Sequence, residues 1–420
     1  MASELFSPLQ LRSGQVLGNR IVKAAMEGGM AGVGQLPDGR LRLLYRRWGA
    51  GGAGLLITGN VMVHAEALTV PGGLVLDDAA PLEPYAAWAA AGKAGGAAIW
   101  MQINHPGRQV LAGMPGVVWG PSAVAVDLGR RSKLFGQPVA MTPEQIDATV
   151  ARFRTTAVLA ELAGFDGVQI HAAHGYLLSQ FLSPLVNRRG DAWGGSLEDR
   201  ARMLLDVVRA VRAAVAPSFG VGVKLNSADF QRGGFEVDDA RRVIAMLEPV
   251  GVDLVELSGG SYESPAMSGH ATDARTRARE AYFLELAKEL AADSPLPLML
   301  TGGITRRQTA EDVLAGGVSL VGMGTALAST PDLPQRWREG READKSLRQV
   351  TWPDKTLASA AAMALVRYQM RRVARGQSPA PGTHPAYALA ADQLEQHRAL
   401  RRYRAWLPTG TAHRSGTADG

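Results

Sequence analysis

Eight short apolar runs recur between residues 21 and 323, and each is followed by a segment of helical character. They lie at 21–26, 54–61, 97–103, 165–171, 220–226, 252–257, 296–301 and 318–323. Each run is continuously apolar, which is typical of strands buried on both faces of a parallel sheet. Eight alternations of strand and helix predict an α/β fold with a single (β/α)8 TIM barrel and favour it over an open doubly wound sheet.

Helix start signals separate the runs. Thr142 stands directly before Pro143, an arrangement typical of a helix N-cap followed by its first turn. Ser196 precedes a segment with acidic residues early and arginines late, which complements a helix dipole. We therefore expect helices to begin after Thr142 and after Ser196.

Three regions are expected along the chain. Residues 1–340 hold the barrel, including a long connection at 104–141 that exceeds a simple turn and is typical of a functional loop. Residues 341–406 form a C-terminal helical extension, with a helix at about 355–375, a Pro/Gly break and one more helix. Residues 407–420 are expected to be a disordered tail.

Composition excludes several classes of protein. The chain has no cysteine, which excludes disulfides and cysteine-ligated iron–sulfur clusters. It shows neither a signal peptide nor an uncharged apolar stretch of the roughly 18 residues that a membrane span requires, so we expect a cytoplasmic protein. The net charge is +6, with much of the excess after residue 366. We interpret that basic end as a solvated helical face and expect no nucleic-acid partner, although basic ends can also contact nucleic acid or acidic membranes.

Glycine pairs follow the last two runs. Gly302 and Gly303 come directly after Thr301, and Gly324 follows the eighth run about 20 residues later. Loops after strands seven and eight of such barrels commonly hold a phosphate, because glycine lets backbone N–H groups approach its oxygens. We predict a phosphate site here, while plain turn chemistry remains the alternative.

Two polar side chains stand at the ends of central strands. Gln102 is an amide, and Lys224 is a cation inside an otherwise apolar run. A buried lysine is costly unless it faces a negative partner. Together the two could face a cofactor that becomes anionic on reduction. The alternatives are a salt bridge between Lys224 and an acid such as Glu256, and a satisfied core amide for Gln102.

His171 and His174 lie three residues apart where the fourth run meets its loop, and Tyr176 follows. Such a pair can donate two hydrogen bonds to one carbonyl oxygen while the phenol supplies a proton. A metal site would need a third ligand and a carboxylate at a strand end. His64 and His105 are candidate ligands, but no HxH pair ends the first run. We therefore predict no metal; two histidines that merely cap the loop are the other alternative.

Residues 165–205 resemble the central block of the old yellow enzyme (NADH:flavin oxidoreductase) family. That block reads FDGVQIHAAHGYLLSQFLSPLVNRRGDAWGGSLEDRARMLL. Supporting motifs follow in the family's order at 19–26, 100–109, 223–230 and 300–324. The resemblance implies a non-covalently bound FMN, reduced by NADH or NADPH, over about residues 5–340.

The resemblance also implies roles for individual positions. The catalytic positions are Tyr176 as proton donor and His171 and His174 as holders of the substrate carbonyl. The positions implied to contact FMN are Ala25, Met26, Glu27, Gly59, Asn60, Gln102, Lys224, Gly302, Gly303, Gly324 and Thr325.

Several of these positions depart from the family's usual pattern. Ala25 stands where proline is frequent, and Glu27 stands where threonine or cysteine usually tunes the flavin. Lys224 replaces a more frequent arginine, which keeps the charge and loses the planar fork. Thr325 stands where an arginine often clamps the phosphate, and Gly29 replaces an aromatic residue. The flavin's potential and the strength of phosphate binding are therefore left open.

The implied reaction is reduction of the C=C bond of an α,β-unsaturated carbonyl compound, an ene reductase reaction with ping-pong kinetics. The alternatives are an FMN barrel acting on dienoyl thioesters or amines, a metal-dependent barrel hydrolase, and a non-catalytic flavin-binding protein whose basic tail engages a partner. The expected partner is a small-molecule substrate. The oligomeric state is left open, because the extra C-terminal helix could pack on a neighbouring subunit and form a homo-oligomer.

Overall fold

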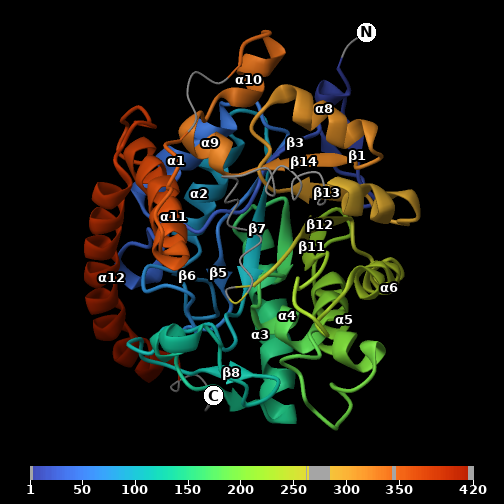
Figure 1. Cartoon of the computed structure of the whole chain (residues 1–420), viewed down its shortest axis with the longest axis vertical. Helices are drawn as coiled ribbons and strands as arrows, with labels where there is room; N and C mark the ends of the chain where they lie inside the picture. Colours follow the sequence, from blue (N-terminus) through green and yellow to red (C-terminus); the bar gives the residue numbers. More distant parts are fainter. Residues whose placement is uncertain (1–2, 262, 264–283, 343–346, 415–420) are drawn as a thin grey trace.

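The computed structural model describes residues 3–261, 263, 284–342 and 347–414 (Figure 1). Its parallel strands close a barrel in the order β3, β4, β7, β10, β11, β12, β13, β14 and back to β3. Their bounds are β3 (Ile21–Lys23), β4 (Leu55–Ile57), β7 (Ala98–Asn104), β10 (Gly167–Ala172), β11 (Gly220–Asn226), β12 (Leu254–Ser258), β13 (Leu298–Thr301) and β14 (Leu320–Met323). Each strand coincides with one of the apolar runs, so the predicted (β/α)8 barrel is confirmed.

Helices cover the outside of the barrel and begin where the cap signals place them. They are α1 (Gly39–Gly49), α2 (Glu83–Lys93), α3 (Pro143–Leu162), α4 (Leu177–Leu182), α5 (Leu197–Ala214), α6 (Val237–Leu247), α8 (Arg307–Ala315), α9 (Thr325–Ser329) and α10 (Leu333–Arg338). Thr142 Oγ1 accepts a hydrogen bond from the Gln145 N–H at 3.3 Å, and Ser196 Oγ accepts one from the Asp199 N–H at 3.2 Å. Both predicted N-caps are therefore confirmed.

An indole fills the barrel near the start of its strands. Trp100 on β7 is fully buried, and a Cβ on Gly167, Gly220 or Gly222 of the neighbouring strands would overlap its ring. Its indole N–H donates to Gln15 Oε1 at 3.1 Å. Glycine on β10 and β11 therefore makes room for one large side chain, which closes this end of the barrel and leaves the polar residues at the opposite, carboxyl end.

The connections carry small elements of their own. The segment from 104 to 141 contains β8 (Trp119–Gly120), η3 (Gly129–Leu134) and β9 (Val139–Ala140). Elsewhere lie η1 (Glu4–Phe6), β1 (Leu9–Gln10), β2 (Val16–Leu17), η2 (Val33–Gln35), β5 (Val61–Met62) and β6 (Leu74–Val75). Because β8 pairs with β9, the long connection is an ordered loop.

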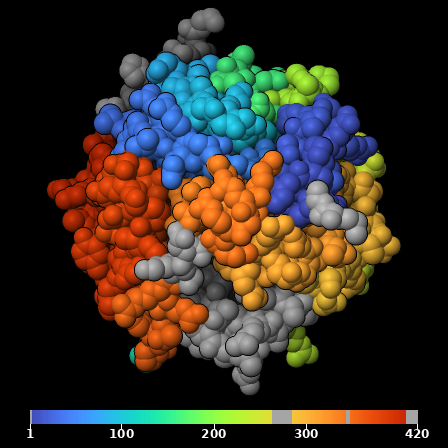
Figure 2. Space-filling model, turned by 90° about the horizontal axis from the view of Figure 1, so that it is seen from above, coloured from blue at the N-terminus to red at the C-terminus, as the bar shows by residue number. Residues whose placement is uncertain are grey.

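Two helices follow the barrel, α11 (Lys355–Val373) and α12 (Pro385–Arg414). They pack against each other, and α11 also packs against α1 and α9. Figure 2 shows this red C-terminal region beside the blue N-terminal part of the chain. Tyr403 Oη donates to the Ala65 carbonyl at 2.8 Å and so attaches α12 to the loops of the barrel. No helix in the described part of the chain is long and apolar enough to cross a membrane.

Helix α12 extends into the segment that was expected to be a disordered tail. The backbone stays helical to Arg414, whereas a tail was expected from residue 407; residues 415–420 lie outside the described residues. Extending an existing helix by one residue adds a hydrogen bond without a new nucleation cost, so a polar composition alone does not end it.

Candidate active site

A chain of buried polar groups crosses four strands at the carboxyl half of the barrel. Gln102 on β7 donates to Gln169 Oε1 at 2.7 Å, and Gln169 on β10 donates to Glu256 Oε2 at 2.7 Å. Lys224 on β11 pairs with the other oxygen of Glu256 on β12 at 2.8 Å. All four side chains are buried, so each needs a polar partner inside the protein. The contacts just described provide these partners.

Two contacts that the sequence offers as alternatives are present in the structure. Lys224 does form the salt bridge with Glu256, and Gln102 is a hydrogen-bonded core amide. Gln169 was not among the site residues predicted from the sequence, although a polar residue in the middle of an otherwise apolar strand is a signal that could have identified it. The charge of Lys224 is therefore held in place by the protein itself.

His171 and His174 meet at the end of β10. Their ring centroids lie 5.0 Å apart at an interplanar angle of 79°, and the Tyr176 ring lies 4.9 Å from that of His171 at 84°. The His174 ring nitrogen Nε2 lies 2.7 Å from Ser258 Oγ, and the His174 N–H donates to Asn226 Oδ1 at 3.1 Å. With a φ of 61°, His174 adopts the left-handed conformation that turns the chain here. The three predicted catalytic residues therefore lie together.

Both imidazoles are held in their neutral form. Burial lowers the pKa of His171 well below 6.5, helped by His174 and Lys224, and burial and Lys224 do the same to the pKa of His174. The Nδ1 atom of His171 accepts the Ala173 N–H at 3.2 Å, which places the ring proton on Nε2. His171 Nε2 is thus a neutral hydrogen-bond donor.

The ends of β3 and β4 form a cavity. Met26, Glu27, Gly59 and Asn60 line it, together with Met370 from α11. A Cβ on Gly59 would overlap the Met26 carbonyl, so only glycine allows these two strand ends to approach. Four of the five predicted residues at these strand ends therefore share one cavity, while Ala25 packs against the barrel core.

Glu27 is the one acid among them. It accepts a hydrogen bond from Thr69 Oγ1. Burial raises the pKa of the Glu27 carboxyl, and the opposing effects of Thr69, Arg367 and Asn60 only partly offset this. The side chain is therefore a weaker acid than an exposed glutamate and a candidate hydrogen-bond donor.

The glycine loops lie at the ends of β13 and β14. Gly302 and Gly303 have φ values of 151° and 65°, which favour glycine. Gly324 precedes α9, and Thr325 is exposed as the first residue of that helix. A Cβ on Gly324 would reach the Met26 side chain at 3.5 Å, so the glycine loops adjoin the β3 cavity. The main-chain N–H on Gln102 donates to Thr58 Oγ1, next to Gly59, at 2.9 Å and joins the polar chain to the same rim.

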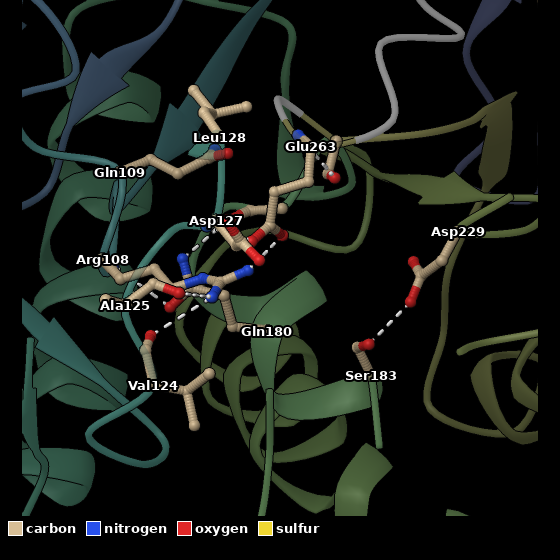
Figure 3. A network of polar contacts seen from close by, with 12 residues as sticks. Arg108, Gln109, Val124, Ala125, Asp127, Leu128, Gln180, Ser183, Asp229 and Glu263 are labelled. Carbon is tan, nitrogen blue, oxygen red and sulfur yellow. Dashed lines mark hydrogen bonds and ion pairs between the residues drawn. The ribbon is translucent and has the colours of Figure 1, made fainter. Parts of the chain in front are cut away.

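A second polar network holds the loops after β7 and β12 together (Figure 3). Arg108 donates to the Val124 and Ala125 carbonyls at 3.2 and 2.7 Å and pairs with Glu263 at 2.5 Å. Glu263 also accepts the Asp127 N–H at 2.6 Å. Sequence reasoning missed this pair, because residues so far apart in the chain show no shared pattern.

In the described ranges, no group of three or more His, Asp or Glu side chains is arranged to hold a metal ion. The donors that converge on this rim are instead amides, imidazoles, an ammonium group and glycine backbone. Such a set suits a planar organic cofactor with a phosphate and a carbonyl-bearing substrate. A model of the NADH:flavin oxidoreductase / NADH oxidase family matches residues 4–344.

The chain belongs to this family.

Relatives within the NADH:flavin oxidoreductase family span most of the chain. An NADH-dependent flavin oxidoreductase from Hypocrea jecorina is 38% identical, over 78% of this chain and 87% of that protein. An NADPH dehydrogenase from Bacillus licheniformis is 33% identical, over 79% of this chain and 93% of its own length. The chain is thus an NAD(P)H-dependent flavin oxidoreductase, and the resemblance to the old yellow enzyme family is confirmed.

Two solved structures resemble the fold. A 2-naphthoyl-CoA reductase in complex with 2-naphthoyl-CoA has a TM-score of 0.73 at 26% identity, over 80% of this chain and 52% of that one. An old yellow enzyme homologue from Zymomonas mobilis has a TM-score of 0.68 at 24% identity, over 82% of this chain and 94% of that one. The second likeness concerns the fold alone.

FMN is the cofactor of the family, with NADH or NADPH as reductant. The residues present fit such a group. Asn60 Oδ1 and Thr301 Oγ1 are buried at strand ends without a hydrogen-bond partner among the described residues, and a Cβ on Gly302 would meet no atom within 4 Å. Unpaired buried polar atoms and open glycine backbone are features of a site that a polar ligand completes.

Stability should depend on pH through three buried imidazoles. Burial lowers the pKa values of His105, His171 and His174 well below 6.5. Below that pH the unfolded chain binds these protons and the folded chain does not, so the free energy of unfolding falls as the pH falls. Each histidine contributes at most about 1.4 kcal/mol per pH unit. Between pH 7 and pH 5.5, the free energy of unfolding measured in urea should therefore fall less for His105→Gln than for the parent.

The matched control is His384→Gln, whose side chain is exposed in the folded chain. It should lose as much stability as the parent between the two pH values. A loss in His105→Gln equal to that of the parent would contradict the assignment of a buried neutral imidazole at this position.

Proposed function

We propose that this protein reduces the C=C bond of α,β-unsaturated carbonyl compounds with electrons from NADH or NADPH. The observation that supports this most is the cluster at the end of β10. There His171 and His174, two imidazoles with lowered pKa values, lie beside each other with the Tyr176 ring edge-on to His171. Neutral imidazoles donate to a carbonyl oxygen without the cost of burying a charge.

The barrel, residues 1–340, is the FMN-binding unit in this proposal, and residues 341–406 are a helical extension. The ring would lie against strand ends one to five, with contacts from Ala25, Met26, Glu27, Gly59, Asn60, Gln102 and Lys224. The phosphate would be held by Gly302, Gly303, Gly324 and Thr325. Lys224 supplies a positive charge beside the ring that the salt bridge with Glu256 keeps in position.

When bound, FMN would supply the redox chemistry, which is hydride transfer from NADH or NADPH to the β-carbon of the substrate. His171 and His174 hold the carbonyl oxygen and stabilise the negative charge that develops there. Tyr176 gives its proton to the α-carbon and recovers one from solvent. The lowered pKa values of the histidines keep both rings neutral through the physiological pH range.

A purified sample tests the proposal directly. The protein should show the visible spectrum of oxidised flavin, and NADH or NADPH added without oxygen should bleach it. Cyclohexenone should then restore the colour with one equivalent of saturated ketone formed. The same reoxidation should be tried with an aryl thioester, since a structural neighbour is a 2-naphthoyl-CoA reductase.

Two outcomes would replace the proposal. Bleaching that only the thioester or another acceptor class reverses would move the substrate class away from enones. A yellow protein that no reduced nicotinamide bleaches would indicate a flavin-binding protein without this activity.

A further inference from the structure

A second, smaller cavity lies behind Glu27, on the side of the C-terminal helices. Its walls are Glu27, Gly29 and Gly72 from the barrel and Arg367, Arg371 and Gln396 from α11 and α12. Glu27, Gly29 and Gly72 also line the larger cavity at the end of β3. The two cavities therefore share a wall at Glu27, Gly29 and Gly72.

The arginines share one acid. Arg367 pairs with Asp392 at 2.6 Å, and Arg371 pairs with the same carboxylate at 2.7 Å. Gln396 also donates to Asp392 at 2.8 Å. Two guanidinium groups therefore share the Asp392 carboxylate at the wall of the cavity, and Glu395 also acts on Arg371.

Arg371 has hydrogen-bonding capacity that the protein does not use. The residue is 7% exposed, and its Nη1 atom is buried without a hydrogen-bond partner among the described residues. A buried guanidinium N–H without an acceptor is costly, and such groups are normally satisfied by protein, water or ligand. The missing acceptor is therefore expected from a molecule inside the cavity.

Glu27 faces the same space from the barrel. Burial raises the pKa of its carboxyl and favours the protonated form, which donates a hydrogen bond. An arginine N–H and a carboxyl O–H on opposite walls both seek an oxygen acceptor. A carboxylate offers two oxygens to such a pair.

We propose that this cavity binds a carboxylate on the substrate, with Arg371 as the residue that selects for it. The inference rests on the proposed function, because it names the substrate class of that site: unsaturated carbonyl compounds that carry a remote carboxylate. The C-terminal helices thereby contribute to substrate specificity in addition to packing against the barrel.

The experiment compares cyclohexenones that carry a ring carboxylate with the same compounds as primary amides. Binding to the FMN-loaded, full-length protein is measured by calorimetry and by the shift of the flavin spectrum. For at least one ring position, the acid should bind about tenfold to a hundredfold more tightly than the amide, as expected for one hydrogen bond to a charged group. Arg371→Met should remove that preference and leave amide binding unchanged, whereas Arg371→Lys should keep part of it.

The matched control is Arg375→Met, four residues further along the chain and just past the end of α11, where the side chain is half exposed and lies 3.7 Å from Glu395. It should keep the full preference. Equal binding of every acid and its amide by the parent protein would overturn the proposal, even if Arg371→Met fails to fold. A folded Arg371→Met with the preference intact would overturn it as well. Binding that prefers acids without any enone turnover would support this site and count against the proposed reaction.

Discussion

Replacing Tyr176 with phenylalanine should slow the reduction of cyclohexenone by about 10²- to 10⁴-fold, the usual value of a general acid. The phenol lies next to His171, whose ring would hold the substrate carbonyl, and phenylalanine keeps the ring that packs there at 4.9 Å. Reduction of the flavin by NADH or NADPH needs no proton from this residue and should stay nearly unchanged. Anaerobic stopped-flow measurement of the two half-reactions separates these effects.

Tyr387→Phe is the matched control, because the Tyr387 side chain is 61% exposed on α12. Neither half-reaction should change in that variant. An equal loss in both half-reactions of Tyr176→Phe would remove Tyr176 from the role of proton donor and would indicate a structural effect.

Glu256→Gln should lower the free energy of unfolding by about 3–5 kcal/mol, because it leaves the buried Lys224 ammonium without its partner. The two side chains are 0% and 5% exposed and lie 2.8 Å apart inside the barrel. Urea unfolding of the FMN-saturated protein measures the change. The double variant Lys224→Met/Glu256→Gln should recover part of the loss, since the Lys224 ammonium is then no longer buried without its partner.

Glu248→Gln provides the comparison. Glu248 pairs with Arg12 at 3.0 Å, but the side chains are 37% and 49% exposed. Loss of this ion pair should lower the free energy of unfolding by no more than about 1 kcal/mol, as for other surface pairs. Equal effects of the two substitutions would show that the Lys224–Glu256 pair contributes no more than a surface contact.

The barrel could be predicted because its signals are local. Each strand is a continuously apolar run, and Thr142 and Ser196 cap their helices with side chains three residues from their partners. Strand ends in a closed parallel barrel meet at one rim, so polar residues there could be expected to converge. That reasoning brought His171, His174 and Tyr176 together correctly.

The partners within the site could not be predicted in the same way. From the sequence, either a cofactor or Glu256 could be the partner of Lys224. Only the register of β11 against β12 places the side chains of Lys224 and Glu256 opposite each other. Gln169 joined them because β10 lies between β7 and β11. Arg108 and Glu263, and likewise Glu27 and Arg371, meet through loops and helices far apart in the chain.

By itself the amino-acid sequence determined the eight strands, the helix starts and the residues that stand at the rim, since hydrophobic period and capping act over a few residues. Tertiary structure alone decided which charge pairs with which, that Trp100 fills the space left by three glycines, and that α11 brings arginines to the cavity behind Glu27. Such contacts arise from closure of the barrel and docking of the C-terminal helices, and their energies depend on distance and burial in space, which no short-range pattern encodes.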